Sequence, residues 1–219
     1  MTDESSLKQV FAGLGAVDLL IANAGMAVPK LFVDQTDSEM HQMMNVNFFG
    51  AANAARCVIP AMQKARKGRV VFVASSMSLT AFAGFAGYCA SKWALRGFAE
   101  CLQSELAPKG VSVQIYYATT MKTPGLVSEN LVKPAVTHEL ESLGDAQEPD
   151  DAARVLLHGI DANRFEICGD AGGEILAMAA LTSPYANTPL RWLLAPLLVP
   201  LAATWRWYTR RVAHKHLKF

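Results

Sequence analysis

Two short apolar runs and a third run that alternates, each followed by a stretch long enough for a helix, constrain the fold more than any other feature of the sequence. They cover residues 17–22, 69–74 and 111–117. A strand that is apolar on both faces is typical of a parallel sheet covered by helices. Strands alternating with helices of ten or more residues form right-handed βαβ units. We therefore expect an α/β fold with a doubly wound, Rossmann-like parallel sheet and a further short strand at residues 164–168.

The stretches between these strands have helix signals. Thr36 and Asp37 offer N-cap residues for a helix that extends to about Met62. Further helices are expected at residues 7–14, 88–106 and 150–159. Residues 124–144, bounded by Pro124 and Gly144, are expected to form a mobile loop that covers the carboxyl edge of the sheet, where open α/β folds bind ligands.

Composition and charge exclude several classes of protein. Of the 219 residues, 52% are hydrophobic and 18% are charged, which excludes a disordered chain. The formal net charge of +1 argues against a nucleic-acid partner. The five histidines are scattered and the cysteines lie far apart, so we expect no metal site and four reduced thiols. The cysteines are Cys57, Cys89, Cys101 and Cys168.

The most specific arrangement of reactive side chains follows the second expected strand. Ser75 comes at the end of that strand, and Tyr88 and Lys92 are one helical turn apart at the start of the next helix. A cation beside a phenol favours the phenolate, so Lys92 is expected to lower the pKa of Tyr88 toward the working range. Ser75 would donate a hydrogen bond to a substrate carbonyl while Tyr88 supplies a proton. A tyrosine four residues before a lysine is, taken alone, common on helices.

Two further motifs precede this group. Asn23, Ala24 and Gly25 directly follow the first expected strand, where a glycine permits a tight turn or the approach of a ligand. Asn47 lies within an expected helix, although asparagine favours helix ends. Each motif has an ordinary structural explanation, a turn in one case and a hydrogen-bonded buried amide in the other. Asn47 could also hold a water molecule in a proton path.

Along the chain the motifs come in the order Asn-Ala-Gly, Asn47, Ser75 and Tyr88-x-x-x-Lys92. In this order they resemble the short-chain dehydrogenase/reductase family, strongly so from Val17 to Gly125. The resemblance implies that Ser75 orients the carbonyl and that Tyr88 is the acid–base group. It implies that Lys92 lowers the pKa of Tyr88 and binds the nicotinamide ribose, and that Asn47 anchors a proton-relay water. The Asn-Ala-Gly segment would contact the cofactor. Asn47, Ser75, Tyr88 and Lys92 are thus the expected catalytic residues.

A second stretch resembles the 3-ketodihydrosphingosine reductase branch of that family. It comprises Thr123-Pro124-Gly125, Glu129-Asn130 and Lys133-Pro134. The resemblance implies NADPH-dependent reduction of a long-chain lipid ketone in sphingolipid biosynthesis, with Thr123 at the cofactor. Another membrane-associated reductase, acting on steroids or retinoids, remains an alternative. Ala118-Thr119 replaces the proline-containing turn of the family, and Thr120 and Lys122 replace expected acidic residues.

The glycine-rich dinucleotide fingerprint is not found before Val17. We expect two βαβ-sized pieces, on the order of 60–80 residues, to be absent from the chain. The 219-residue chain would then be either part of an active reductase or a short isoform that acts as an inactive partner of a full-length enzyme. These 219 residues alone would not bind NADPH detectably.

The C-terminal part is unusually apolar. We expect a domain at residues 1–170 and an apolar C-terminal appendage at residues 171–219. From Ile175 to Trp205 the only charged residue is Arg191, and Pro196 and Pro200 are expected to break any helix. Aromatic and basic residues follow, as in a belt at lipid headgroups. An interfacial anchor on the cytoplasmic face of the endoplasmic reticulum is predicted, and a surface for homo-oligomers is the alternative.

Overall fold

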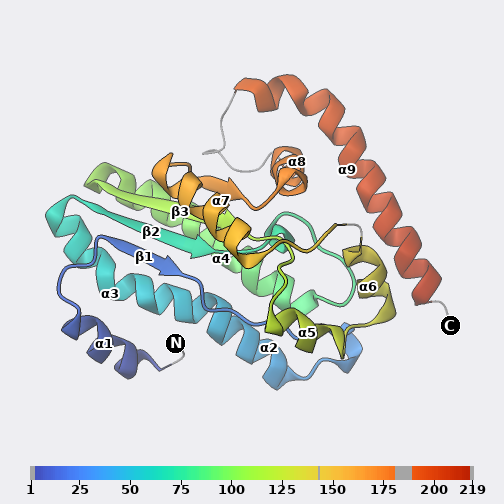
Figure 1. Cartoon of the computed structure of the whole chain (residues 1–219), viewed down its shortest axis with the longest axis horizontal. Coiled ribbons are helices and arrows are strands. Elements are labelled where there is room, and N and C mark those ends of the chain that lie inside the picture. Colours follow the sequence, from blue (N-terminus) through green and yellow to red (C-terminus); the bar gives the residue numbers. More distant parts are fainter. Residues whose placement is uncertain (1–2, 143, 181–188, 218–219) are drawn as a thin grey trace.

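The structure, a computed structural model, describes residues 3–142, 144–180 and 189–217. Its centre is a parallel sheet in which the strands follow one another in chain order (Figure 1). The strands are β1 (Leu19–Ala22), β2 (Gly68–Val73), β3 (Val111–Tyr117) and β4 (Glu166–Cys168). Each pairs in parallel with the next. The predicted α/β fold with a parallel sheet is confirmed.

Helices and single turns connect and cover the strands. The helices are α1 (Glu4–Gly13), α2 (Asp37–Met44), α3 (Gly50–Ala65), α4 (Ala86–Leu106), α5 (Pro124–Asn130), α6 (Ala135–Glu141), α7 (Pro149–Asp161), α8 (Ala171–Ala180) and α9 (Pro189–His216). The single turns are η1 (Phe32–Asp34), η2 (Asn45–Phe49), η3 (Ser76–Ser78) and η4 (Ala107–Lys109), of which η2 is a π-helix and the others are 3-10 helices.

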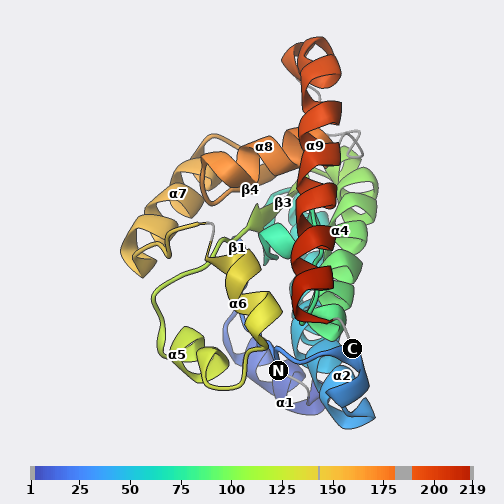
Figure 2. The ribbon, with the colours of Figure 1, turned by 90° about the vertical axis from the view of Figure 1, so that its right-hand side faces the viewer.

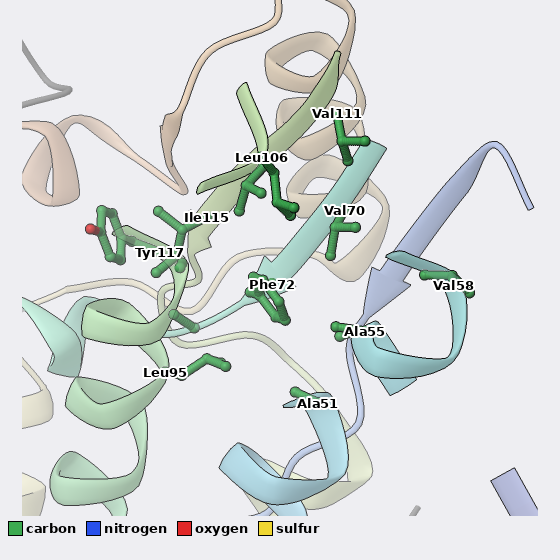
Figure 3. Close-up of a cluster of buried hydrophobic side chains, with 14 of the residues drawn as sticks. Ala51, Ala55, Val58, Val70, Phe72, Leu95, Leu106, Val111, Ile115 and Tyr117 are labelled. Carbon is green, nitrogen blue, oxygen red and sulfur yellow. The ribbon is translucent and has the colours of Figure 1, made fainter. Parts of the chain in front are cut away.

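The sheet separates two hydrophobic clusters. Because side chains alternate along a strand, Val70 and Phe72 of β2 point to one face and Val71 and Val73 to the other. On the first face α3 and α4 pack their apolar stripes against β2 and β3 (Figure 3). On the second face, α7 contributes Ile160 to a smaller cluster. The larger cluster holds α4 in place, and α4 carries two of the predicted site residues.

Residues 124–144 differ from the predicted loop. They form two short helices, α5 and α6, in the part of this segment that the structure describes. Thr123 caps α5, because its Oγ1 accepts a hydrogen bond from the Leu126 amide at 3.2 Å. Pro124 is the first residue of that helix, where its missing N–H costs nothing. The residues that suggested a loop boundary are therefore the start signal of a helix.

The C-terminal region also differs from expectation. Helix α9 continues through Pro196 and Pro200, which were predicted to break it. The two prolines are four residues apart and therefore remove N–H donors on the same side of the helix. Helix α9 runs along one side of the molecule and packs on α8 and α6 (Figures 1 and 2). Within the described ranges, no helix combines the length and the apolar character needed to cross a bilayer.

Candidate active site

The end of β2 places Ser75. Backbone hydrogen bonds from Ala74 to the Tyr116 carbonyl and from Ser76 to the Ala118 carbonyl, both 2.8 Å, extend the pairing with β3 past the strand. Ser75 then caps η3, since its Oγ accepts a hydrogen bond from the Met77 amide at 3.2 Å. Its side chain is thereby fixed at the carboxyl edge of the sheet. Ser76, the alternative serine, is the first residue of η3.

The first turns of α4 bring Tyr88 and Lys92 to the same place. Lys92 is 4% exposed, and its Nζ donates a hydrogen bond to the Val73 carbonyl at 2.9 Å. The same Nζ lies 5.8 Å from the centroid of the Tyr88 ring. Ser75, Tyr88 and Lys92 line one cavity of about 210 Å³, called the smaller cavity below. Three residues from two elements therefore face a common space.

Burial controls the protonation of this group. It raises the pKa of Tyr88 to about 12, and hydrogen bonding with Ser75 offsets only part of that effect. It lowers the pKa of Lys92 to about 8. The expectation that Lys92 brings the pKa of Tyr88 toward neutrality is wrong for this structure, because desolvation by burial is the largest effect on the phenol and raises its pKa. At neutral pH Tyr88 is thus a protonated phenol beside an ammonium group.

Asn47 supports the site without lining the cavity. It lies in the π-helical turn η2 and is fully buried. Its Oδ1 accepts from the Met26 amide at 2.8 Å, and its Nδ2 donates to the Met26 carbonyl at 2.9 Å and to Ser91 Oγ at 2.8 Å. Asn47 therefore ties the segment after β1 to α4, one residue away from Lys92. Its predicted role as a water anchor stays a prediction.

The Asn-Ala-Gly segment contributes two of its three residues to the smaller cavity, namely Asn23 and Gly25. A Cβ on Gly25 would come within 3.3 Å of both Asn47 Oδ1 and Lys92 Nζ, so only glycine fits there without displacing them. Ala24 is exposed and is not among the lining residues. Thr123 borders the cavity as well, and its hydroxyl also caps α5.

Sequence reasoning missed the wall that α5, α6 and the end of β3 build. Thr119, Glu129 and Glu141 line the smaller cavity beside Tyr88. Thr119 Oγ1 is buried and has no hydrogen-bond partner within the described residues. Glu129 was visible only as part of a motif, and nothing in the sequence marked Glu141, because its place depends on the position of α6.

Helix α6 is held by a close contact against Ala83 and Gly84, which precede α4. Thr137 Oγ1 donates to the Ala83 carbonyl at 2.9 Å, and a Cβ on Gly84 would lie 1.8 Å from that hydroxyl. Gly84 also has φ = +93°, a conformation that favours glycine. The contact fixes the distance between α6 and the start of α4.

A second cavity of about 620 Å³, the larger cavity, adjoins the first and has mostly apolar walls. Helices α8 and α9 contribute Ile175, Leu176, Leu201 and Trp205 to it. Trp205 is fixed by a hydrogen bond from its Nε1 to Thr80 Oγ1 at 2.9 Å. Both cavities share the residues Ser76, Met77, Thr119, Thr120 and Glu141. The two cavities therefore share a wall next to Ser75.

Comparisons with known proteins agree with this geometry. Residues 2–132 match the family described as short chain dehydrogenase. The chain is 32% identical over 206 residues to a 3-ketodihydrosphingosine reductase of Dictyostelium discoideum, covering 90% of this chain and 62% of that protein. It is 34% identical over 185 residues to the protein of that name from Bos taurus, with 82% and 56% covered. The chain thus spans only about three fifths of the length of these relatives.

Solved structures share the fold. A short chain dehydrogenase from Burkholderia cenocepacia in complex with NADP superposes with a TM-score of 0.70 at 24% identity, covering 91% of this chain and 76% of that one. A short-chain dehydrogenase from Sphingobium yanoikuyae in complex with NADPH gives a TM-score of 0.68 at 21% identity, with 92% and 70% covered.

Proposed function

The chain belongs to the short-chain dehydrogenase family, and from that premise we propose that it carries the ketone-reducing site of an NADPH-dependent reductase of long-chain keto lipids. The leading substrate is 3-ketodihydrosphingosine, after the names of its relatives. One observation carries the proposal. Ser75, Tyr88 and Lys92 line a cavity that shares a wall with a larger, mostly apolar one. A lipid ketone needs both parts, donors for its oxygen and an apolar space for its chain.

The residues present fit the nicotinamide end of the cofactor. The Lys92 ammonium and the Tyr88 hydroxyl would hold the ribose, and the unpartnered Thr119 Oγ1 offers a hydrogen bond in the same wall. Gly25 leaves the space that a side chain would fill. When bound, NADPH supplies the hydride.

The chain's own residues would handle the carbonyl oxygen. Ser75 donates a hydrogen bond to it, and the protonated Tyr88 gives it a proton as negative charge develops there. Burial keeps the Tyr88 proton in place until the oxygen accepts it. The positive charge of Lys92 stabilises the phenolate that remains. Asn47 acts as a positioning residue, because it forms hydrogen bonds with Met26 and Ser91 and does not line the cavity.

The assay compares three carbonyl compounds. Protein expressed from the full reading frame should oxidise NADPH with 3-ketodihydrosphingosine and should not do so with a steroid ketone or a retinoid. The expected selectivity rests on the apolar residues that α8 and α9 contribute to the larger cavity, which suit a long alkyl chain. Turnover of the steroid or the retinoid without turnover of the keto base would contradict the proposal.

We also propose that α9 binds the cytoplasmic face of the endoplasmic reticulum membrane. Leu197 and Trp207 on this helix are 71% and 58% exposed. Arg206 and Arg210 are exposed as well, and Arg211 stacks on Trp207 with 5.3 Å between the guanidinium carbon and the ring centroid. Exposed aromatic and basic residues together favour an interface with anionic lipids. The same surface would otherwise serve a homo-oligomer.

Liposome flotation separates these two roles. The double variant Arg206→Ala/Arg210→Ala should bind vesicles of anionic phospholipid about thirtyfold more weakly, because each of the two cations near such a surface contributes about 1 kcal/mol. Arg56→Ala/Arg154→Ala, which removes two arginines exposed on α3 and α7, is the matched control and should float like the unchanged protein. Self-association in light scattering without any lipid-dependent flotation would favour the oligomer.

A further inference from the structure

The two cavities differ in what lines them on either side of the catalytic pair. Helices α8 and α9 line only the larger cavity. Glu129 lines only the smaller one, together with Ser75 and Tyr88. A ketone whose oxygen is held by Ser75 and Tyr88 would have its two substituents in different surroundings. One substituent would enter the apolar space, and the other would face Glu129.

The two carboxylates of the smaller cavity are not equivalent. Glu141 is neutralised by a buried ion pair with Lys133, whose side chain is 1% exposed, and it accepts a hydrogen bond from Thr120 Oγ1 at 3.3 Å. Lys133 is also bonded to Asn130 Oδ1 at 2.8 Å. Glu129, in contrast, has neither a hydrogen bond nor an ion pair from its carboxylate within the described part of the chain, although it is partly buried. It is the carboxylate of this wall that lacks a partner.

Burial and two neighbouring charges act on Glu129. Burial raises its pKa, the charge of Lys133 has the next largest effect and lowers it, and the charge of Glu141 raises it. The charge of Glu129 in turn raises the pKa of Tyr88, so the two groups lie within electrostatic reach of each other. A partly buried carboxylate without a partner gains from a cation that forms a charge-assisted hydrogen bond with it.

We propose that Glu129 selects ketones that carry an ammonium group on the carbon next to the carbonyl, on the side away from the alkyl chain. The inference rests on the proposed function and adds to it the residue that reads the polar end of the substrate. The ketone oxygen lies at Ser75 and Tyr88, the chain extends along α8 and α9, and the ammonium donates to the Glu129 carboxylate. A neutral ketone of the same chain length leaves that carboxylate unpaired and binds more weakly.

Binding can be measured without turnover. Trp205 lines the larger cavity, so its fluorescence should respond to a chain that enters there. The probes are a short-chain sphingoid base, which carries the ammonium, and its N-acetyl derivative, which is neutral. The unchanged protein should bind the base about tenfold more tightly, which is typical of one charge-assisted hydrogen bond. Glu129→Gln should remove this preference, and Glu129→Asp should keep most of it.

Glu105→Gln is the matched control, because Glu105 is exposed at the far end of α4 and should keep the full preference. Three results would overturn the inference. The first is that the unchanged protein binds both probes equally. The second is that Glu129→Gln keeps the preference for the base. The third is that Glu129→Gln and Glu129→Asp both lose the binding of both probes. Failure of the unchanged protein to bind either probe would instead count against the proposed lipid-ketone function.

Discussion

Tyr88→Phe is expected to lower the turnover of ketone reduction between about a hundredfold and ten-thousandfold, the range that a positioned acid–base group contributes. The variant keeps the ring and its contact with Phe85, whose centroid lies 5.6 Å away, and loses only the hydroxyl. Among the described residues that line the smaller cavity, Tyr88 is the one with a phenol, so no other described tyrosine is placed to supply the proton. Turnover with NADPH and 3-ketodihydrosphingosine is the measurement.

Tyr116→Phe is the control for this variant. The Tyr116 hydroxyl donates to the Ala152 carbonyl at 3.3 Å, on the second face of the sheet and away from both cavities. It should retain turnover within a small factor. If Tyr88→Phe retains it as well, the proton comes from another group and the proposed role of Tyr88 is wrong.

Lys92→Met is expected to change how the free energy of unfolding depends on pH. Burial lowers the pKa of Lys92 from 10.5 in the unfolded chain to about 8 in the fold. Between these values the unfolded chain binds more protons, so this lysine makes the protein more stable as the pH rises. The gain is about 3 kcal/mol over the interval. In the methionine variant this contribution is absent.

Urea unfolding at several pH values tests this expectation. Other groups act in the opposite direction, since burial raises the pKa of Cys89 to about 11 and alkaline pH then destabilises the fold. The informative quantity is therefore the difference between the variant and the unchanged protein, which should shift in favour of the unchanged protein from pH 8 upward. Lys109→Met, at an exposed position, should show no such shift. Parallel pH curves for Lys92→Met would mean that Lys92 is not desolvated.

The sheet could be predicted from the sequence because its central strands are rich in apolar residues and lie between helix-length stretches. Residues 69–74 and 111–117 contribute buried side chains to the clusters on both faces of the sheet, and the observed β2 and β3 match them closely. Residues 124–144 were misjudged, because a proline and a capping threonine mark both the end of a loop and the start of a helix. Local signals do not decide between these two when the helix has only seven residues.

The candidate site was predictable where it depends on one element and not where it depends on several. Tyr88 and Lys92 are one turn apart on a helix, so their proximity follows from the sequence. Their pKa values do not, because desolvation depends on the packing of α4 against β2 and on the wall formed by α5 and α6. The place of Glu141 in that wall likewise required the position of α6.

The number of residues in the π-helical turn η2 determines which side chains of the flanking helices face the core. Its wide loop, closed by the hydrogen bond from the Gly50 amide to the Asn45 carbonyl, accommodates one residue more than a regular turn. Each residue turns a helix by about 100°. Deleting a single residue there would rotate the apolar stripe of α3 away from Phe72 or swing the Asn47 amide away from Met26. Any homologous chain that keeps both contacts must conserve this count, even where the residues themselves change.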